Sequence, residues 1–186
     1  MNFMFLLLII LVGFVFSCQA IIYSKRNIKK TWEKLYAQLI HRCELVSNLL
    51  DVIKKNIKKE EIQEKMFSNV IYAINGYARY QTFGDVMRVN SDFILTLKKL
   101  FAYTDKYPDL KKDIDFQRII SEISRAEDRI ENMRQNYNSA VSKYNKIIVA
   151  FPNNYIASLF NMHKKRFFSD IECERTIPKN DTNYIS

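Results

Sequence analysis

The side chains of this sequence that could carry chemistry are polar residues that share a helical face with apolar ones. Arg42 falls within a series of apolar residues that recur at steps of three and four, the spacing of one face of a helix. We predict that Arg42 pairs with an acid on a later helix, either Glu122 or Glu127. We interpret the polar residues on these apolar faces as a buried polar network that fixes helix register. The alternative interpretation is a site between the helices that binds a partner or a small ligand. The predicted network comprises Arg42, Glu122, Glu127, Arg134, Asn138 and Asn145.

Patterns typical of catalysis or metal binding are missing from the sequence. It has no Gly-rich phosphate loop, no nucleophile elbow and no paired Glu-x-x-His. The three cysteines are widely scattered, and His41 and His163 are each alone. Cys43 follows Arg42, which could activate it, but we expect a buried and unreactive thiol. We therefore predict a protein that is not an enzyme and that binds no metal or cofactor.

The formal net charge of the chain is +9, and its basic residues are spread along the sequence except for two clusters. Charge alone would allow nucleic-acid binding, but elsewhere Lys and Arg are mixed with Asp and Glu, so no nucleic-acid partner is expected. Basic clusters can also bind an anionic membrane surface, which the placement of these two favours. The predicted membrane-surface residues are Lys25, Arg26, Lys29, Lys30, Lys164, Lys165, Arg166, Phe167 and Phe168.

Residues 1–24 contain no charged side chain and are long enough to cross a bilayer as a helix. A cleaved signal peptide would normally carry basic residues before the apolar run, and this sequence has none. The positive residues after the segment place the N-terminus outside and the body in the cytoplasm, so we expect a single-pass protein of the inner membrane. A lipoprotein, suggested by the residues before Cys18, or an envelope-facing body is the alternative.

Amphipathic periodicity predicts four helices after this segment, over about residues 25–56, 62–82, 86–107 and 115–150. Gly84 is expected to close the second helix in a left-handed conformation. Pro and Gly are rare and the connections are short, so the helices should alternate in direction. The predicted fold class is all-α: an N-terminal transmembrane helix followed by a long antiparallel four-helix bundle (up-down-up-down).

The predicted organisation has three parts. Residues 1–24 form the transmembrane helix, and residues 25–168 form the bundle with a short C-terminal membrane-proximal segment. Residues 169–186 form a polar tail that we expect to be flexible. In the last long helix Tyr137-Asn138 recurs as Tyr144-Asn145, and we expect tyrosines half in the core with their hydroxyls near polar partners.

An ordered series of motifs resembles the LemA family of bacterial membrane proteins. The first bundle helix carries Gln38-Leu39, Arg42, Glu44-Leu45 and Asn48-Leu49, and Tyr107-Pro108-Asp109 follows later. The series continues through Glu127, Arg129-Ile130, Arg134, Tyr137-Asn138, Tyr144-Asn145 and Phe151-Pro152 to Phe167-Phe168. His41 and Ser47 depart from the family's usual Arg and Pro. The loss of that Pro should straighten the helix.

The resemblance implies one N-terminal membrane anchor and a long antiparallel four-helix bundle. It implies no catalytic residues, because the family has no established biochemical activity. The sequence thus predicts a membrane-anchored, non-catalytic interaction or scaffold protein whose partners are the lipid bilayer and an unidentified protein. The alternative is a small-ligand sensor that uses the polar stripe of the last long helix. The sequence does not determine the oligomeric state.

Overall fold

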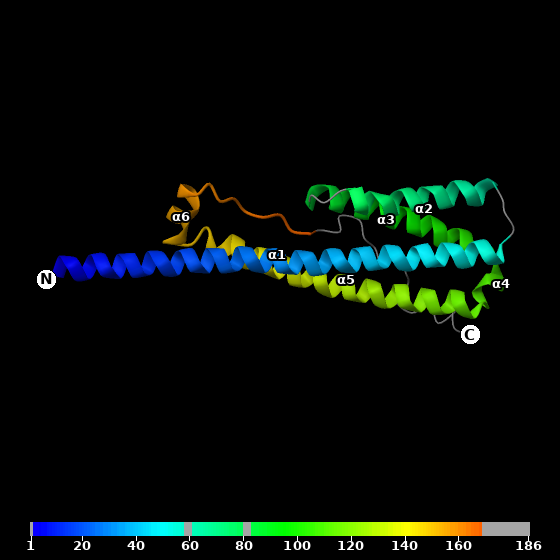
Figure 1. Ribbon diagram of the computed structural model, residues 1–186, viewed down its shortest axis with the longest axis horizontal. Helices are drawn as coiled ribbons and strands as arrows, with labels where there is room; N and C mark the ends of the chain where they lie inside the picture. The colour runs from blue at the N-terminus through cyan, green and yellow to red at the C-terminus, as the bar shows by residue number, and fades with distance from the viewer. Residues whose placement is uncertain (1, 58–60, 80–82, 169–186) are drawn as a thin grey trace. The chain divides into compact units, whose positions relative to one another are not determined.

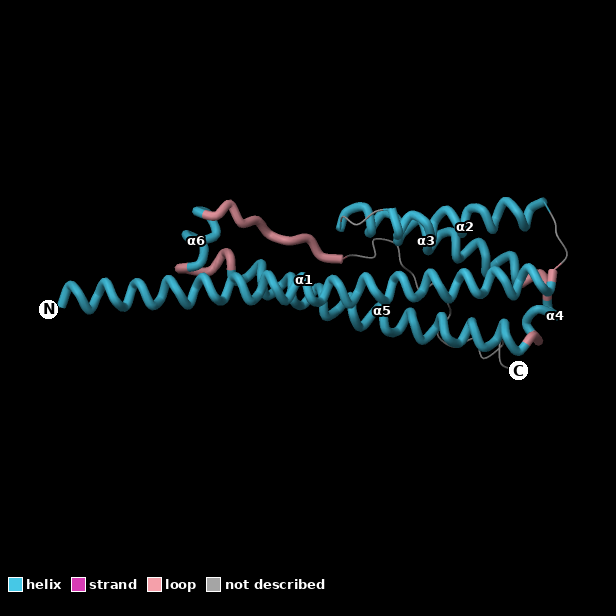
Figure 2. The backbone as a smooth tube through the Cα atoms, in the orientation of Figure 1, coloured by secondary structure: helices cyan, strands magenta, loops and turns pink. Residues whose placement is uncertain are grey.

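The computed structural model describes residues 2–57, 61–79 and 83–168, which contain helices and no strand (Figures 1 and 2). The prediction of an all-α chain is therefore confirmed. The predicted polar tail, residues 169–186, lies outside the described residues. The helices are α1 (Asn2–Asn56), α2 (Glu61–Arg79), α3 (Phe83–Thr104), α4 (Pro108–Lys111), α5 (Ile114–Ile147) and α6 (Asn153–Leu159).

The longest helix, α1, joins the predicted membrane segment to the first bundle helix without a break. It has 55 residues and contains no Pro, and its one glycine, Gly13, faces open space. By length and composition it is a candidate membrane span. Large apolar side chains before the first charged residue, among them Phe5, Leu11 and Phe16, are exposed.

The described residues fall into two compact units. Unit 1 comprises residues 2–36 and 131–168, and unit 2 comprises residues 37–130 with the gaps given above. Both units contain a part of α1 and a part of α5, whereas α2, α3 and α4 belong to unit 2 and α6 to unit 1.

In unit 2, α2 and α3 lie side by side and run in opposite directions (Figure 1). A Cβ atom on Gly76 would stand 3.0 Å from Cγ1 of Val89, so a larger residue at this position would require the Val89 side chain to shift. The predicted role of Gly84 is wrong. This residue lies within α3, and the described residues include no glycine with positive φ. The connection between α2 and α3, residues 80–82, lies outside the described residues.

The part of α5 in unit 2 runs antiparallel to α1. The Nδ2 atom of Asn56, at the end of α1, lies 3.3 Å from Oδ2 of Asp113, just before α5, while Arg42 meets Glu127 further along both helices. Side chains of α1, α2, α3 and α5 form the core of this unit. Its members include Leu39, Val46, Leu49, Ile53, Val70, Tyr77, Phe93, Leu97, Ile123 and Ala126.

In unit 1, α5 again runs antiparallel to α1, and the rings of Trp32 and Tyr137 are 5.7 Å apart. Helix α5 ends at Ile147, and α6 begins directly after Pro152. Asn161 adopts a left-handed conformation with φ of 49°, and the Met162 amide donates to the Ala157 carbonyl at 2.8 Å. This arrangement closes a helix as glycine commonly does. Residues 163–168 then continue without helical structure.

Candidate functional site

Arg42 is the best-connected polar residue of unit 2. The apolar face of α1 carries it into the core, where only 1 % of its surface is exposed. Its Nη1 atom donates to Oε1 and Oε2 of Glu127 on α5 at 3.1 and 3.4 Å. The structure thus brings Arg42 to one of the two acids considered from the sequence. Glu122, on the same helix, is half-buried and forms no hydrogen bond or ion pair with the described residues.

The other guanidinium nitrogen of Arg42 reaches α2 and α3. Nη2 donates to the Tyr77 hydroxyl at 2.9 Å and to Oδ1 of Asn90 at 2.7 Å. The Tyr77 hydroxyl in turn donates to the same Asn90 oxygen at 2.8 Å. The Phe93 ring lies 4.6 Å from the guanidinium carbon, a cation–π distance. One buried side chain therefore connects all four long helices of unit 2.

Arg42 stays charged in this network, whereas the neighbouring Cys43 thiol and Tyr77 phenol stay neutral. Burial opposes the charge of Arg42, but Tyr77 and Glu127 outweigh burial and raise its pKa above the ordinary value. Burial raises the pKa of Cys43 to about 12, more than the adjacent Arg42 lowers it. Burial also raises the pKa of Tyr77. Neither the thiol nor the phenol is ionised near neutral pH, so neither is an activated nucleophile or base.

The described residues contain no group of three or more His, Cys, Asp or Glu side chains that could hold a metal ion. The chemistry that Arg42 can perform here is to bind and orient groups, not to transfer protons. Its Nε atom is buried and has no hydrogen-bond partner among the described residues. The remaining donors meet side chains of the protein itself.

The asparagines predicted to join this network lie in unit 1 and bind the C-terminal segment instead. Asn145 accepts from the Lys165 amide at 2.8 Å and donates to the Lys165 carbonyl at 2.9 Å. Asn138 makes the same pair of bonds with Phe168, at 2.8 and 2.9 Å. We call these two residues the asparagine clamp. Arg134 binds Glu131 at 2.7 Å and is not part of it.

The spacing of the clamp follows from backbone geometry. Seven residues along a helix advance about 10.5 Å, and three residues of extended chain advance about 10 Å. Side chains seven residues apart on α5 therefore meet backbone groups three residues apart in residues 163–168, which we call the strap. The Tyr137 hydroxyl adds a bond to the Arg166 carbonyl at 3.3 Å. The seven-residue repeat of Tyr-Asn was visible in the sequence, but the sequence did not indicate that the strap binds it.

The predicted membrane-surface residues all lie in unit 1, and all but one are exposed. Lys25, Arg26, Lys29 and Lys30 project from α1, and Lys164, Lys165, Arg166 and Phe167 lie on the strap. Phe168 is the exception, because it is buried and not at the surface as predicted. Only 1 % of its surface is exposed, and its ring lies 6.2 Å from that of Trp32. This residue fixes the end of the strap to the core of unit 1.

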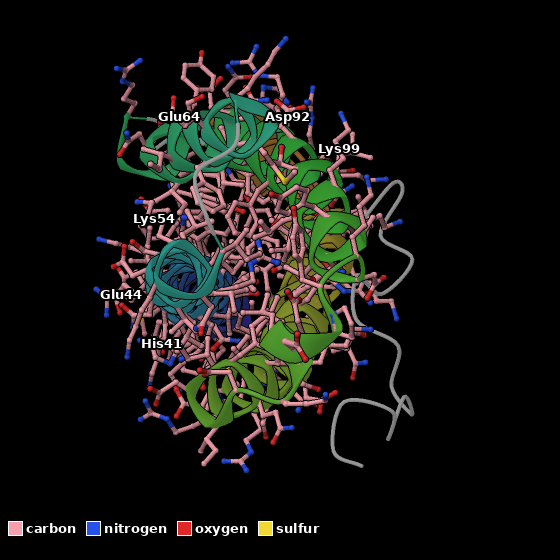
Figure 3. The ribbon with its side chains drawn as sticks, turned by 90° about the vertical axis from the view of Figure 1, so that its right-hand side faces the viewer. His41, Glu44, Lys54, Glu64, Asp92 and Lys99 are labelled. Atoms are coloured by element: carbon pink, nitrogen blue, oxygen red, sulfur yellow. The ribbon has the colours of Figure 1, made fainter. Side chains whose placement is uncertain are left out.

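A groove of about 550 Å³ between α2 and α3 was not predicted. Its lining includes the apolar side chains of Met66, Tyr72 and Leu95, and none of the predicted network residues. Asp92 and Lys99, seen on α3 in Figure 3, also line it.

On α1, His41 and Glu44 lie 3.5 Å apart and point away from the bundle interior, as Figure 3 shows.

Comparison with known proteins identifies the family. The family model of the LemA family matches residues 31–181, which include Arg42, Glu127, the asparagine clamp and the strap. The magnetosome proteins MamQ 1 and MamQ 2 of Paramagnetospirillum magneticum are each 30 % identical to this chain over 74 residues. That similarity covers 40 % of this chain and 27 % of each relative, so the chain spans about a quarter of the length of these relatives. On the family match, this chain belongs to the LemA family.

Proposed function

We propose that this protein is a single-pass protein of the bacterial inner membrane whose helical bundle docks a protein partner and performs no catalysis. The observation that carries the proposal is α1, one continuous helix. It presents exposed apolar side chains before Lys25 and buried ones from Leu35 to Ile53. Such a helix anchors a folded body directly, with no linker between span and bundle.

The orientation rests on charge. Four basic residues follow the span directly, and three more lie on the strap of the same unit. An excess of Lys and Arg marks the cytoplasmic side of a membrane helix, which supports a cytoplasmic bundle and an outside N-terminus. Each basic residue near an anionic leaflet contributes about 1 kcal/mol of attraction.

The docking surface we propose is the groove between α2 and α3. Tyr72 is 72 % exposed there, and Leu95 beside it is also exposed. Large exposed aromatic and apolar side chains mark protein-binding sites. The charged residues of the groove are Arg79, Arg88, Lys99 and Asp92, an excess of positive charge. The partner that fits is an amphipathic helix with an apolar face and flanking acidic residues.

Photo-crosslinking in living cells tests this surface. A photoreactive amino acid replaces Leu95, and a matched control places it at Ile114, an exposed apolar residue outside the groove. We expect Leu95 alone to crosslink a partner, and the crosslinked peptide to carry acidic residues beside an apolar face. Reversing charge with Arg79→Glu and Lys99→Glu should abolish the crosslink. The same products from both positions, or products indifferent to charge reversal, would rule the groove out.

A further inference from the structure

The C-terminal part of unit 1 contains an uncharged segment that neither the anchor nor the bundle explains. From Ile147 to Met162 there is no Asp, Glu, Lys, Arg or His, whereas Lys143 and Lys146 precede it and His163 to Arg166 follow it. The segment contains α6. One face of the segment is packed, with Ile148 and Ile156 buried, but four large side chains are not. Phe151 is 80 % and Leu159 is 75 % exposed, and Tyr155 and Phe160 are exposed as well.

The position of this segment along α1 is set by antiparallel packing within unit 1. Trp32 lies against Tyr137, so residues later in α5 meet residues earlier in α1. Lys25 is seven residues before Trp32, and Lys146 is nine residues after Tyr137. The last charged residues of α1 and α5 at this end of unit 1, Lys25 and Lys146, therefore lie at about the same height along the helix pair. Beyond that level, Phe151, Pro152, Tyr155 and Leu159 line an apolar cavity of about 400 Å³ with Gly13, Phe14 and Ser17.

These observations place α6 beside the part of α1 that is apolar enough to lie in a bilayer. Ser17 is eight residues before Lys25, which corresponds to about 12 Å along a helix. Half of a hydrocarbon core is about 15 Å thick. A segment packed at this level and flanked by charged residues on both sides is therefore within reach of one leaflet's hydrocarbon.

We propose that residues 147–162 form a re-entrant element. It leaves the cytoplasm after Lys146, inserts α6 into the adjoining leaflet against α1, and returns at the basic strap. The partner of its exposed face is the acyl chains of lipid. This inference rests on the proposed membrane anchoring of α1 and adds a second membrane-embedded segment to it.

Part of the backbone of the segment suits such a site, because polar backbone groups in lipid must be satisfied internally. Amides of Ala150, Asn154, Phe160 and Met162 all donate to carbonyls within the segment, and Pro152 has no amide to satisfy. The segment is also too short to cross the bilayer as a helix, since α6 has seven residues and a span needs about 20. Insertion into one leaflet and return is the arrangement that its length allows.

Depth measurement by spin labelling tests the proposal. Full-length protein with Cys18, Cys43 and Cys173 changed to Ala is reconstituted into vesicles of phosphatidylethanolamine and phosphatidylglycerol. Single cysteines are introduced as Leu159→Cys, Val12→Cys on α1, Lys164→Cys on the strap and Ile114→Cys in unit 2. All four positions are exposed, so the label displaces no packed side chain. Accessibility of each nitroxide to oxygen, which enters hydrocarbon, is compared with accessibility to a water-soluble nickel chelate.

We expect the Leu159 and Val12 labels to be inaccessible to the nickel chelate but accessible to oxygen. The Lys164 and Ile114 labels should remain accessible to the chelate. A Leu159 label open to the chelate while the Val12 label is not would overturn the re-entrant element and leave the anchor intact. Chelate access at both positions would overturn the anchor as well. A Leu159 label closed to both reagents would show that protein, such as a second copy of this chain, covers the site and would also contradict the proposal.

A second readout avoids the cysteine-free background. Trp32 is the only tryptophan, so Trp32→Phe with Leu159→Trp gives a single fluorophore at the proposed site. Lipids brominated on the acyl chain should quench its emission, and the same change at Phe167→Trp on the strap serves as the control. Equal quenching at both positions, or none at Leu159→Trp, would contradict insertion of α6.

Discussion

At the scale of residues, a buried guanidinium needs partners that offset the loss of water. Arg42 has three, from three other helices, and an aromatic ring beside it. A buried ion pair of this kind is weak evidence for net stability, but removal of one partner leaves a charge uncompensated. We therefore interpret the network as a device that fixes how α1, α2, α3 and α5 align.

Substitution of Glu127 should show this effect. Glu127→Ala should lower the free energy of unfolding by about 2 kcal/mol. This value is below the usual 3–5 kcal/mol for breaking a buried pair because the Glu127 side chain is 26 % exposed and Tyr77 and Asn90 still bind Arg42. The measurement is thermal unfolding of the full chain in detergent, followed by circular dichroism. Glu122→Ala on the same helix is the matched control and should change little. Equal effects of the two substitutions would refute the role of the network.

The raised pKa values predict how stability depends on pH. Burial raises the pKa of Cys43 from its ordinary value of 9.0 to about 12, and that of Tyr77 is raised too. The folded state holds these protons more tightly than the unfolded state does. Their contribution to stability is therefore complete below about pH 9 and is lost as pH rises toward about 12.

Melting temperatures measured between about pH 7 and about pH 11 check this. We expect a plateau at the lower end and a decline above about pH 9, with a shallower decline for Cys43→Ala. A melting temperature that does not change over the alkaline range would contradict the prediction.

At the scale of elements, the strap depends on side chains and not on secondary structure. Each clamp asparagine makes two bonds to one strap residue, and each hydrogen bond contributes about 1 kcal/mol. Asn138→Ala should therefore free the end of the strap and speed amide hydrogen exchange at Phe168. Exchange measured by mass spectrometry on the full chain tests it. Asn136→Ala, an exposed asparagine on the same helix, serves as the control, and unchanged exchange in Asn138→Ala would count against the clamp.

The aromatic end of the strap has its own test. The Phe168 ring covers Trp32, so Phe168→Ala should expose the indole and shift its fluorescence emission to longer wavelength. The lost burial should also cost about 3 kcal/mol of stability. Phe167→Ala removes a neighbouring ring that is already exposed and should do neither. A red shift in Phe167→Ala equal to that in Phe168→Ala would contradict the assignment.

The sequence predicted helices well and contacts between distant residues less well. Periodicity and Pro108 located α1, α3 and α5 to within a few residues, because those signals are local. The prediction for Gly84 failed because glycine also occurs inside helices. The left-handed residue that the structure does show is Asn161, which follows α6. The pairing of Arg42 with Glu127 followed from charge on two apolar faces. The clamp could not be predicted, because the strap has no periodicity and its bonds go to backbone atoms.

At the scale of the whole molecule, α1 and α5 each take part in two units. One unit has the apolar end of α1 and the uncharged segment of α6, and the other has the arginine network and the α2–α3 groove. This division supports the proposal that one unit meets lipid and the other a partner protein. Anchoring through a continuous helix requires that the bundle lie on the side where the basic residues follow the span.

Cysteine accessibility in intact cells tests the central claim most directly. Ile114→Cys in the cysteine-free background places one thiol on unit 2, at a side chain that is 82 % exposed. A membrane-impermeant maleimide is added before or after the cells are opened. We expect labelling only after the cells are opened, as for a bundle in the cytoplasm. Labelling of intact cells would place the bundle on the outer face and contradict the proposed orientation.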